Sequence, residues 1–273
     1  MERAVVGGFF ADRLGLAFAA GYGAALRALV PSLTEGVIAG LCATEAGGAH
    51  PSSIATLLRR DATGAATLDG SKTFATLADE ADVLFVVASE GRLESGKNRL
   101  RLVRVRTSGA GVRITRRPDL PFAPEIGHAE VVFHDAPVTA TDVLPGDGYD
   151  VYLKPFRTIE DIHVHAACLG WLVGVAGRSG WPRAFFEQAA AIALGLTGAA
   201  ALDPSAPEGH VALAGLLAQT QALVASSEAE WATVDAETRE RWQRDRPLLG
   251  VAQAARGLRL AAAWRALGAG SEP

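Results

Sequence analysis

A strand-like segment, residues 39–147, lies between two helical segments, and this order restricts the fold more than any other feature of the sequence. Residues 8–30 are mostly apolar and are followed by Pro31, which predicts a single helix that ends there. After about residue 150 the chain becomes rich in Ala and Leu, which favour helix. In this part we predict helices over residues 159–175, 184–196, 211–224 and 248–267.

Short apolar runs separated by turn-forming residues predict strands in the middle segment. Residues 83–87 are continuously apolar, as in a buried strand. Asp69-Gly70 is typical of a hairpin turn. Several short strands joined by such turns indicate a sandwich or barrel. We therefore expect an α+β chain with an N-terminal helical segment (1–38), a central antiparallel β-domain (39–147) and a C-terminal helical bundle (148–273).

Charge and cysteine content exclude several classes of protein. The net charge of -4 gives no electrostatic reason to expect a nucleic-acid partner. Hydrophobic residues make up 49% of the chain, but many are alanines, and we expect no membrane span. The N-terminus lacks the layout of a signal peptide, and Cys42 and Cys168 lie far apart, so a reducing cytoplasm is the expected location. His163 and His165 are two residues apart and cannot form a metal pair on one helix face, and no metal site is expected.

Motifs in the middle segment resemble those of the acyl-CoA dehydrogenase family. Residues 41–50 (LCATEAGGAH) are similar to the family's Leu-Thr-Glu-Pro-Gly-Ala-Gly segment, and residues 70–76 (GSKTFAT) to its Gly-x-Lys-x-Trp-Ile-Thr segment. The segments 81–87, 130–138 and 146–149 resemble three further motifs in the same order. Each motif alone is weak, whereas their order over about a hundred residues is fairly specific. The resemblance implies a shortened, divergent member of this family.

Membership of this family implies a flavin cofactor, FAD, bound by the β-domain. The resemblance implies cofactor contacts from Phe74 and Thr76 and from the segment that holds Leu41, Ala43 and Thr44. A flat isoalloxazine ring needs an apolar face and a few placed hydrogen-bond donors, which these residue types supply. The alternative is that Phe74 is an ordinary core residue and Thr76 an ordinary strand threonine.

The loop after Thr44 differs from the family pattern. Residues 47–51 are one residue shorter than the family's loop, and the serine expected to touch substrate is not evident. Ala49, His50 and Ser52 are the candidate substrate contacts, and either Ser52 or Ser53 would take the place of the family's serine. The alternative is a plain turn.

A catalytic base is the second requirement, since dehydrogenation beside a thioester removes an α-proton. A carboxylate in a dry pocket suits this role because desolvation raises its pKa. Most family members carry the glutamate late in the chain, and no matching segment is present here. A minority carry it on the first helix of the C-terminal domain, where Glu160 occupies the matching position. The residue after it is Asp161 in place of the family's Arg, and the alternative for Glu160 is an ordinary helix acid.

The resemblance implies a flavin-dependent oxidoreductase of fatty acid metabolism that dehydrogenates acyl-CoA or another acyl thioester. Electron-transfer flavoprotein or a similar acceptor would take the electrons. A second hypothesis is a non-catalytic subunit that completes a heteromeric dehydrogenase, and a third is a remnant that has lost flavin. The strongly apolar C-terminal helices predict a homodimer or higher oligomer, or a heteromer.

Overall fold

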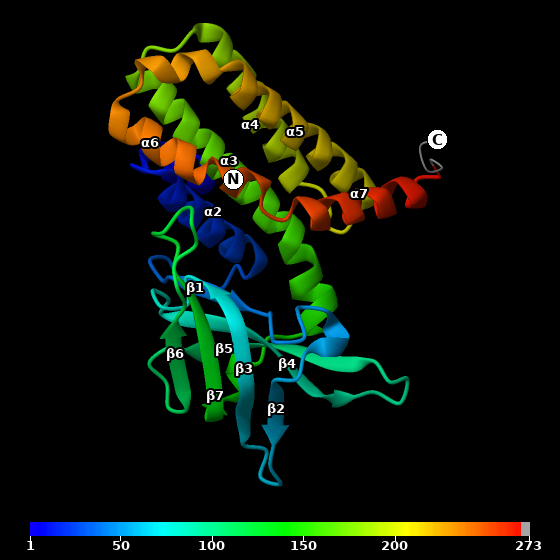
Figure 1. Cartoon of the computed structure of the whole chain (residues 1–273). Coiled ribbons are helices and arrows are strands. Elements are labelled where there is room, and N and C mark those ends of the chain that lie inside the picture. The colour runs from blue at the N-terminus through cyan, green and yellow to red at the C-terminus, as the bar shows by residue number, and fades with distance from the viewer. Residues whose placement is uncertain (269–273) are drawn as a thin grey trace. The chain divides into compact units, whose positions relative to one another are not determined.

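The computed structural model describes residues 1–268, which form two compact units (Figure 1). The β unit contains residues 29–119 and 126–155. The helical unit contains residues 1–28 and 120–125 and the chain from Phe156 onward. The chain is therefore mixed α+β, as the sequence predicts.

Seven strands make up the sheet of the β unit, in the spatial order β1-β4-β2-β3-β7-β6 with β5 paired to β4. Neighbouring strands are antiparallel except for the β1–β4 and β2–β4 pairs, which confirms a mostly antiparallel sheet. The strands are β1 (Ala39–Cys42), β2 (Leu57–Arg60), β3 (Ala66–Thr76), β4 (Val83–Arg92), β5 (Asn98–Arg106), β6 (Val112–Arg116) and β7 (His128–Val138).

Strand β5 buries side chains on both of its faces. Leu100 and Leu102 are buried on one face. Val103 and Val105 are buried on the opposite face, because successive strand side chains alternate. Val103 and Val105 join buried residues of β3, β4 and β7 in a single apolar core.

The prediction of a hairpin turn at Asp69-Gly70 is wrong. Both residues lie inside β3, and the pairing of β3 with β7 shifts register between Leu68 and Gly70. Gly70 has φ +142°, and a Cβ there would lie 2.7 Å from the Thr56 Cα. Glycine is therefore required here by a bulge and by the close approach of another backbone segment. Both are common reasons for a glycine inside a strand. The turn between β2 and β3 falls at residues 61–65, where Asp61 N donates to Ala65 O.

Seven α-helices make up the described part of the helical unit and its junction with the β unit. Residues 8–30 do not form one helix, because residues 11–13 separate α1 from α2. The predicted C-terminal helices are present, and a polar helix, α6, was not predicted. The helices are α1 (Glu2–Phe10), α2 (Leu14–Leu29), α3 (Lys154–Arg178), α4 (Arg183–Ala200), α5 (Pro207–Ser226), α6 (Ala236–Asp245) and α7 (Gln253–Ala266).

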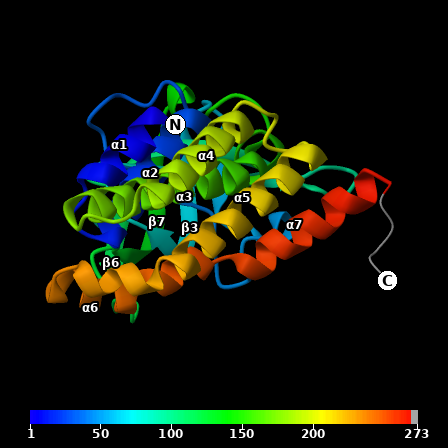
Figure 2. The same cartoon turned by 90° about the horizontal axis from the view of Figure 1, so that it is seen from above.

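Small residues let α1 and α2 approach α3 closely. A Cβ on Gly8 would lie 1.9 Å from Ala167 O, and one on Gly170 would lie 2.3 Å from Val5 O. Gly21 of α2 similarly faces the backbone of α3 at Val164. Helices α4, α5 and α7 lie side by side in the same unit (Figure 2).

Helix α3 is the central element of the helical unit. By length and hydropathy the helical stretch Gly148–Arg178 could cross a membrane, but 83% of its most apolar window is buried inside the protein. This burial is typical of a core helix in a globular protein. Trp171 of α3 also begins a buried aromatic cluster in which the Trp231 and Trp242 rings stack with centroids 4.7 Å apart.

Candidate functional site

The end of β1 and the end of β3 lie side by side in the β unit. Thr73 N donates to Thr44 O at 2.9 Å, and a Cβ on Gly40 would lie 3.0 Å from Thr76 O. Leu41 and Ala43 are buried, and Thr44 is partly exposed. The paired register of β1 with β4 ends at Cys42, so Ala43 and Thr44 lie past that ladder. The structure thus brings four of the five predicted cofactor contacts, Leu41, Ala43, Thr44 and Thr76, into one neighbourhood.

Phe74 is the fifth predicted contact, and it is not a core residue. Its side chain is 39% exposed. The His128 ring lies against it with centroids 4.2 Å apart, and the Arg117 guanidinium lies 5.9 Å from the ring centroid. Arg117 is held by a 3.0 Å hydrogen bond from Nη1 to Thr73 O. The exposed aromatic therefore has a fixed setting, with a cation and an imidazole beside it.

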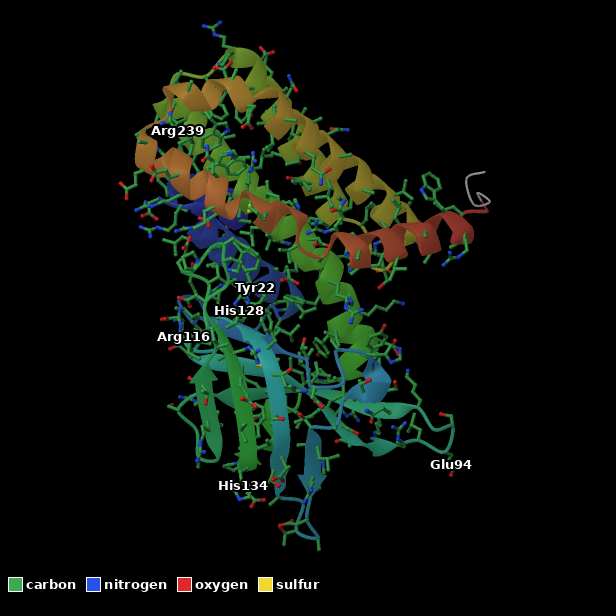
Figure 3. The ribbon with its side chains drawn as sticks, viewed as in Figure 1. Tyr22, Glu94, Arg116, His128, His134 and Arg239 are labelled. Atoms are coloured by element: carbon green, nitrogen blue, oxygen red, sulfur yellow. The ribbon has the colours of Figure 1, made fainter. Side chains whose placement is uncertain are left out.

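His128 marks the end of the sheet that carries Phe74. Figure 3 labels His128 at the upper end of β7 and His134 lower on the same strand. Thr76 is the Cα partner of His128 in the β3–β7 ladder. Burial lowers the pKa of His128, so its ring is neutral at neutral pH.

A buried ion pair fixes the segment that follows Thr44. Lys72 is fully buried, and its Nζ donates to Glu45 Oε1 and to Val87 O, both at 2.6 Å. The Glu45 carboxylate also accepts from Ala55 N and from Thr56 N and Oγ1. Burial raises the pKa of Glu45, but the Lys72 charge and these hydrogen bonds outweigh it and hold that pKa below its ordinary value. The carboxylate therefore ties three parts of the chain together.

The predicted substrate contacts lie on the short loop within this network. Glu45 and Gly48 exchange two backbone hydrogen bonds, which closes a tight turn. Ala49 is partly exposed, and His50 and Ser52 are exposed. His50 Nδ1 lies 2.7 Å from Ser52 Oγ. Their polar atoms are therefore accessible but bond to each other.

Glu160, the candidate base, belongs to α3 in the helical unit. Its side chain is partly buried. Burial and the neighbouring Asp161 charge raise its pKa to about 7, against the opposing charges of Arg256 and Arg259. A carboxyl group that titrates near neutral pH is suited to general base catalysis.

Asp161, the next residue on α3, is turned away from solvent. Asp161 is buried and accepts from Arg256 Nε at 2.9 Å and from Arg259 Nη2. Both arginines come from α7, about a hundred residues away, so helical geometry alone could not reveal them. His165 lies one turn further along α3, with its Nδ1 2.8 Å from the Asp161 backbone oxygen. Burial lowers the pKa of His165 to about 4.

A separate groove of about 780 Å³ lies in the β unit. It is bordered by the 30–37 linker, the end of β5 and residues 137–145. Phe74, Thr76 and Thr44 do not line this groove. The candidate cofactor site therefore rests on the geometry at the ends of β1 and β3.

Several residues of the site were not predicted from the sequence. Lys72 and Glu45 lie within the quoted motifs, and this shared occurrence is the one sequence feature that could have indicated the buried pair. Arg117, Arg256 and Arg259 carry no motif, and only the three-dimensional contacts reveal them.

Comparison with known proteins finds a family match for part of the chain. Residues 40–136 match the model of the acyl-CoA dehydrogenase middle domain. No curated protein sequence matches the chain. Solved structures with a similar fold include the butyryl-CoA dehydrogenase of Megasphaera elsdenii, with 18% identity over 93% of this chain and 78% of that one and a TM-score of 0.69.

Two further structures are similar at the same level. FkbI, a protein for biosynthesis of the methoxymalonyl extender unit of the Fk520 polyketide, is 20% identical over 97% of this chain and 83% of its own, with a TM-score of 0.72. FMN-bound TdsC of Paenibacillus sp. A11-2 is 16% identical over 92% of this chain and 79% of its own, with a TM-score of 0.70. At these identities the structures establish a shared fold.

Proposed function

Because residues 40–136 belong to the acyl-CoA dehydrogenase middle-domain family and the chain has the acyl-CoA dehydrogenase fold, we propose that this protein is a flavin-dependent oxidoreductase that dehydrogenates an acyl thioester between its α and β carbons. The observation that carries the proposal is the cluster at the ends of β1 and β3, where Thr44, Phe74 and Thr76 come together.

These residues fit a flavin. Phe74 offers an exposed aromatic surface at a fixed position. The backbone past Cys42 offers polar groups beyond the paired part of β1, and the hydroxyls of Thr44 and Thr76 are the side-chain donors. An isoalloxazine ring, with an apolar end and a polar edge, requires this combination. When bound, the flavin supplies the hydride acceptor.

FAD is the cofactor we propose, on the strength of the family resemblance, although the similar TdsC structure is bound to FMN. Cofactor released from the purified protein by heat and separated by chromatography distinguishes the two. The proposed substrate is acyl-CoA or another acyl thioester, with electron-transfer flavoprotein or a similar protein as acceptor. A cytoplasmic role in fatty acid metabolism follows from this proposal.

Glu160 is the proposed general base for the α-proton. Its pKa of about 7 allows the carboxylate to be present at neutral pH and still accept a proton readily. The surrounding α3 residues from Asp161 to Gly170 are buried, which limits access of water from the helical unit.

The visible spectrum of the purified protein tests the proposal. We expect absorbance near roughly 450 nm, the property of an oxidised flavin. Phe74→Ala should lower the flavin content, while Val132→Ala, which shortens another exposed apolar strand residue, should leave it unchanged. A protein that stays colourless after incubation with both FAD and FMN would instead support a remnant that has lost the cofactor.

A further inference from the structure

The charged groups around Glu160 come from two helices far apart in the sequence. Asp161 follows Glu160 on α3 and is 7% exposed. Arg256 Nε donates to Asp161 Oδ1 at 2.9 Å, and Arg259 Nη2 donates to Oδ2. The arginines are three residues apart on α7 and share one helix face, so a single carboxylate can hold both.

Helix α7 has few other attachments in the described part of the chain. Ala263 is its one buried residue, and α7 otherwise packs along α5. Arg256 Nη1 also donates to Leu249 O at 3.3 Å, just before the helix begins. The side chains of Arg256 and Arg259 are 16% and 21% exposed, so they are mostly removed from water. A desolvated ion pair of this kind has a strong electrostatic effect on its neighbours.

We infer that α7 completes the base site, with Arg256 and Arg259, anchored on Asp161, as positioning residues that control the charge of Glu160. This inference rests on the proposed role of Glu160 as the base. It assigns a function to α7 that neither the motifs nor the family match contains, since the match ends at residue 136.

Charge balance explains why the arginines are needed. Asp161 alone would place a second carboxylate beside Glu160, and like charges disfavour ionisation. Two guanidinium groups more than neutralise Asp161. The charges that shift the pKa of Glu160 most belong to Asp161, Arg256 and Arg259. Arg157, three residues before Glu160 on α3, is a further cation on this helix and acts on Arg259. His163 and His165 on α3 have lowered pKa values and are neutral at neutral pH.

The alternative is that the ion pairs only fasten α7 to α3. The two roles predict opposite shifts for Glu160 when the arginines are removed. If they control its charge, loss of two cations raises the pKa of Glu160. If they only fasten the helix, α7 loosens and water enters, so the pKa falls towards its ordinary value near 4.5.

The experiment is a direct carboxyl titration of the whole protein by NMR with carboxyl-labelled glutamate. The signal that Glu160→Gln removes is assigned to Glu160. In Arg256→Met/Arg259→Met the midpoint should rise by about 1 pH unit or more, whereas Arg256→Lys/Arg259→Lys should keep the parent midpoint. Asp161→Asn, which leaves both cations in place, should lower it.

Should the double Met variant fail to fold by circular dichroism, Arg259→Met alone is measured, with a smaller rise expected. An unchanged or lowered midpoint in the Met variants would overturn the inference. The base assignment fails separately, if Glu160→Gln retains full turnover, because the titration does not depend on activity.

Discussion

Glu160 and Asp161 are adjacent in the sequence but lie in different electrostatic settings. The pKa of Glu160 is raised to about 7, whereas Asp161 forms two ion pairs. The difference arises because the arginines of α7 contact Asp161 directly and reach Glu160 only through space. The residue that departs from the family pattern is thus the one that recruits cations to the site.

Glu160→Gln should lower the turnover of an acyl thioester by about 10²–10⁴-fold, the usual contribution of a positioned general base. The parent rate should rise with pH through about 7, because only the ionised carboxylate accepts a proton. Glu187→Gln, an exposed acid on α4, is the matched control and should not change the rate. A substitution at 160 that leaves both turnover and the pH profile intact would make Glu160 an ordinary helix acid.

Loss of one partner of the buried Lys72–Glu45 pair should strongly lower stability. Lys72→Met leaves the Glu45 carboxylate without its cation inside the protein, and removal of one partner of such a pair typically costs about 3–5 kcal/mol. Urea denaturation measures this loss. Lys97→Met breaks the exposed pair with Asp150 and should cost far less, because an exposed pair is screened by water.

The double variant Lys72→Met/Glu45→Gln adds a test of coupling. Because no uncompensated charge is left, its free energy of unfolding should fall by less than the sum of the two single changes. Additive losses would show that the pair does not act as a unit.

At the scale of elements, small residues decide how α1 meets α3. Gly8→Ala should destabilise the protein and loosen α1, because the added Cβ would lie 1.9 Å from Ala167 O. Gly198→Ala on α4 is the control, since a Cβ there meets nothing within 4 Å. Alanine also has the higher helix propensity, so the control should gain up to about 1 kcal/mol. Thermal unfolding of both variants measures the contrast, and equal midpoints would contradict the close approach.

Sequence patterns predicted the order of elements because periodicity and turn residues are local signals. They failed at Gly70, where glycine allows a bulge inside β3 instead of a turn. They also failed at residues 11–13, Ala-Asp-Arg, which separate α1 from α2 although they include neither Gly nor Pro. Helix α6 was missed because its sequence is strongly polar, while Trp242 packs it into the aromatic cluster.

The candidate site likewise contains residues that the sequence predicts and contacts that it does not. Thr44, Phe74 and Thr76 were selected from motifs, and the structure brings their segments together through one backbone hydrogen bond and a close approach of β1 to β3. The partners of Asp161 and the cation beside Phe74 depend on contacts between distant segments. Such contacts leave no periodic signal in a single sequence.

At the scale of the whole molecule, the helical unit exposes apolar side chains that a monomer would leave in water. Leu194 on α4 is 74% exposed and Leu258 on α7 is 75% exposed, while Trp264 is 43% exposed. Many of the other exposed residues on these helices are alanines. Large exposed apolar patches usually mark protein interfaces.

We therefore expect light scattering at micromolar concentration to give a mass of at least twice the 28.4 kDa of one chain. Leu194→Glu and Leu258→Glu should each lower that mass towards the monomer, because a buried unpaired carboxylate disfavours association. Leu93→Glu is the control, since Leu93 is 46% exposed on the β4–β5 hairpin, outside the helical unit. A parent protein that elutes with a mass of 28.4 kDa would refute self-association of the isolated chain. If a monomeric parent gains flavin or activity only with a second protein, the heteromeric hypothesis is favoured instead.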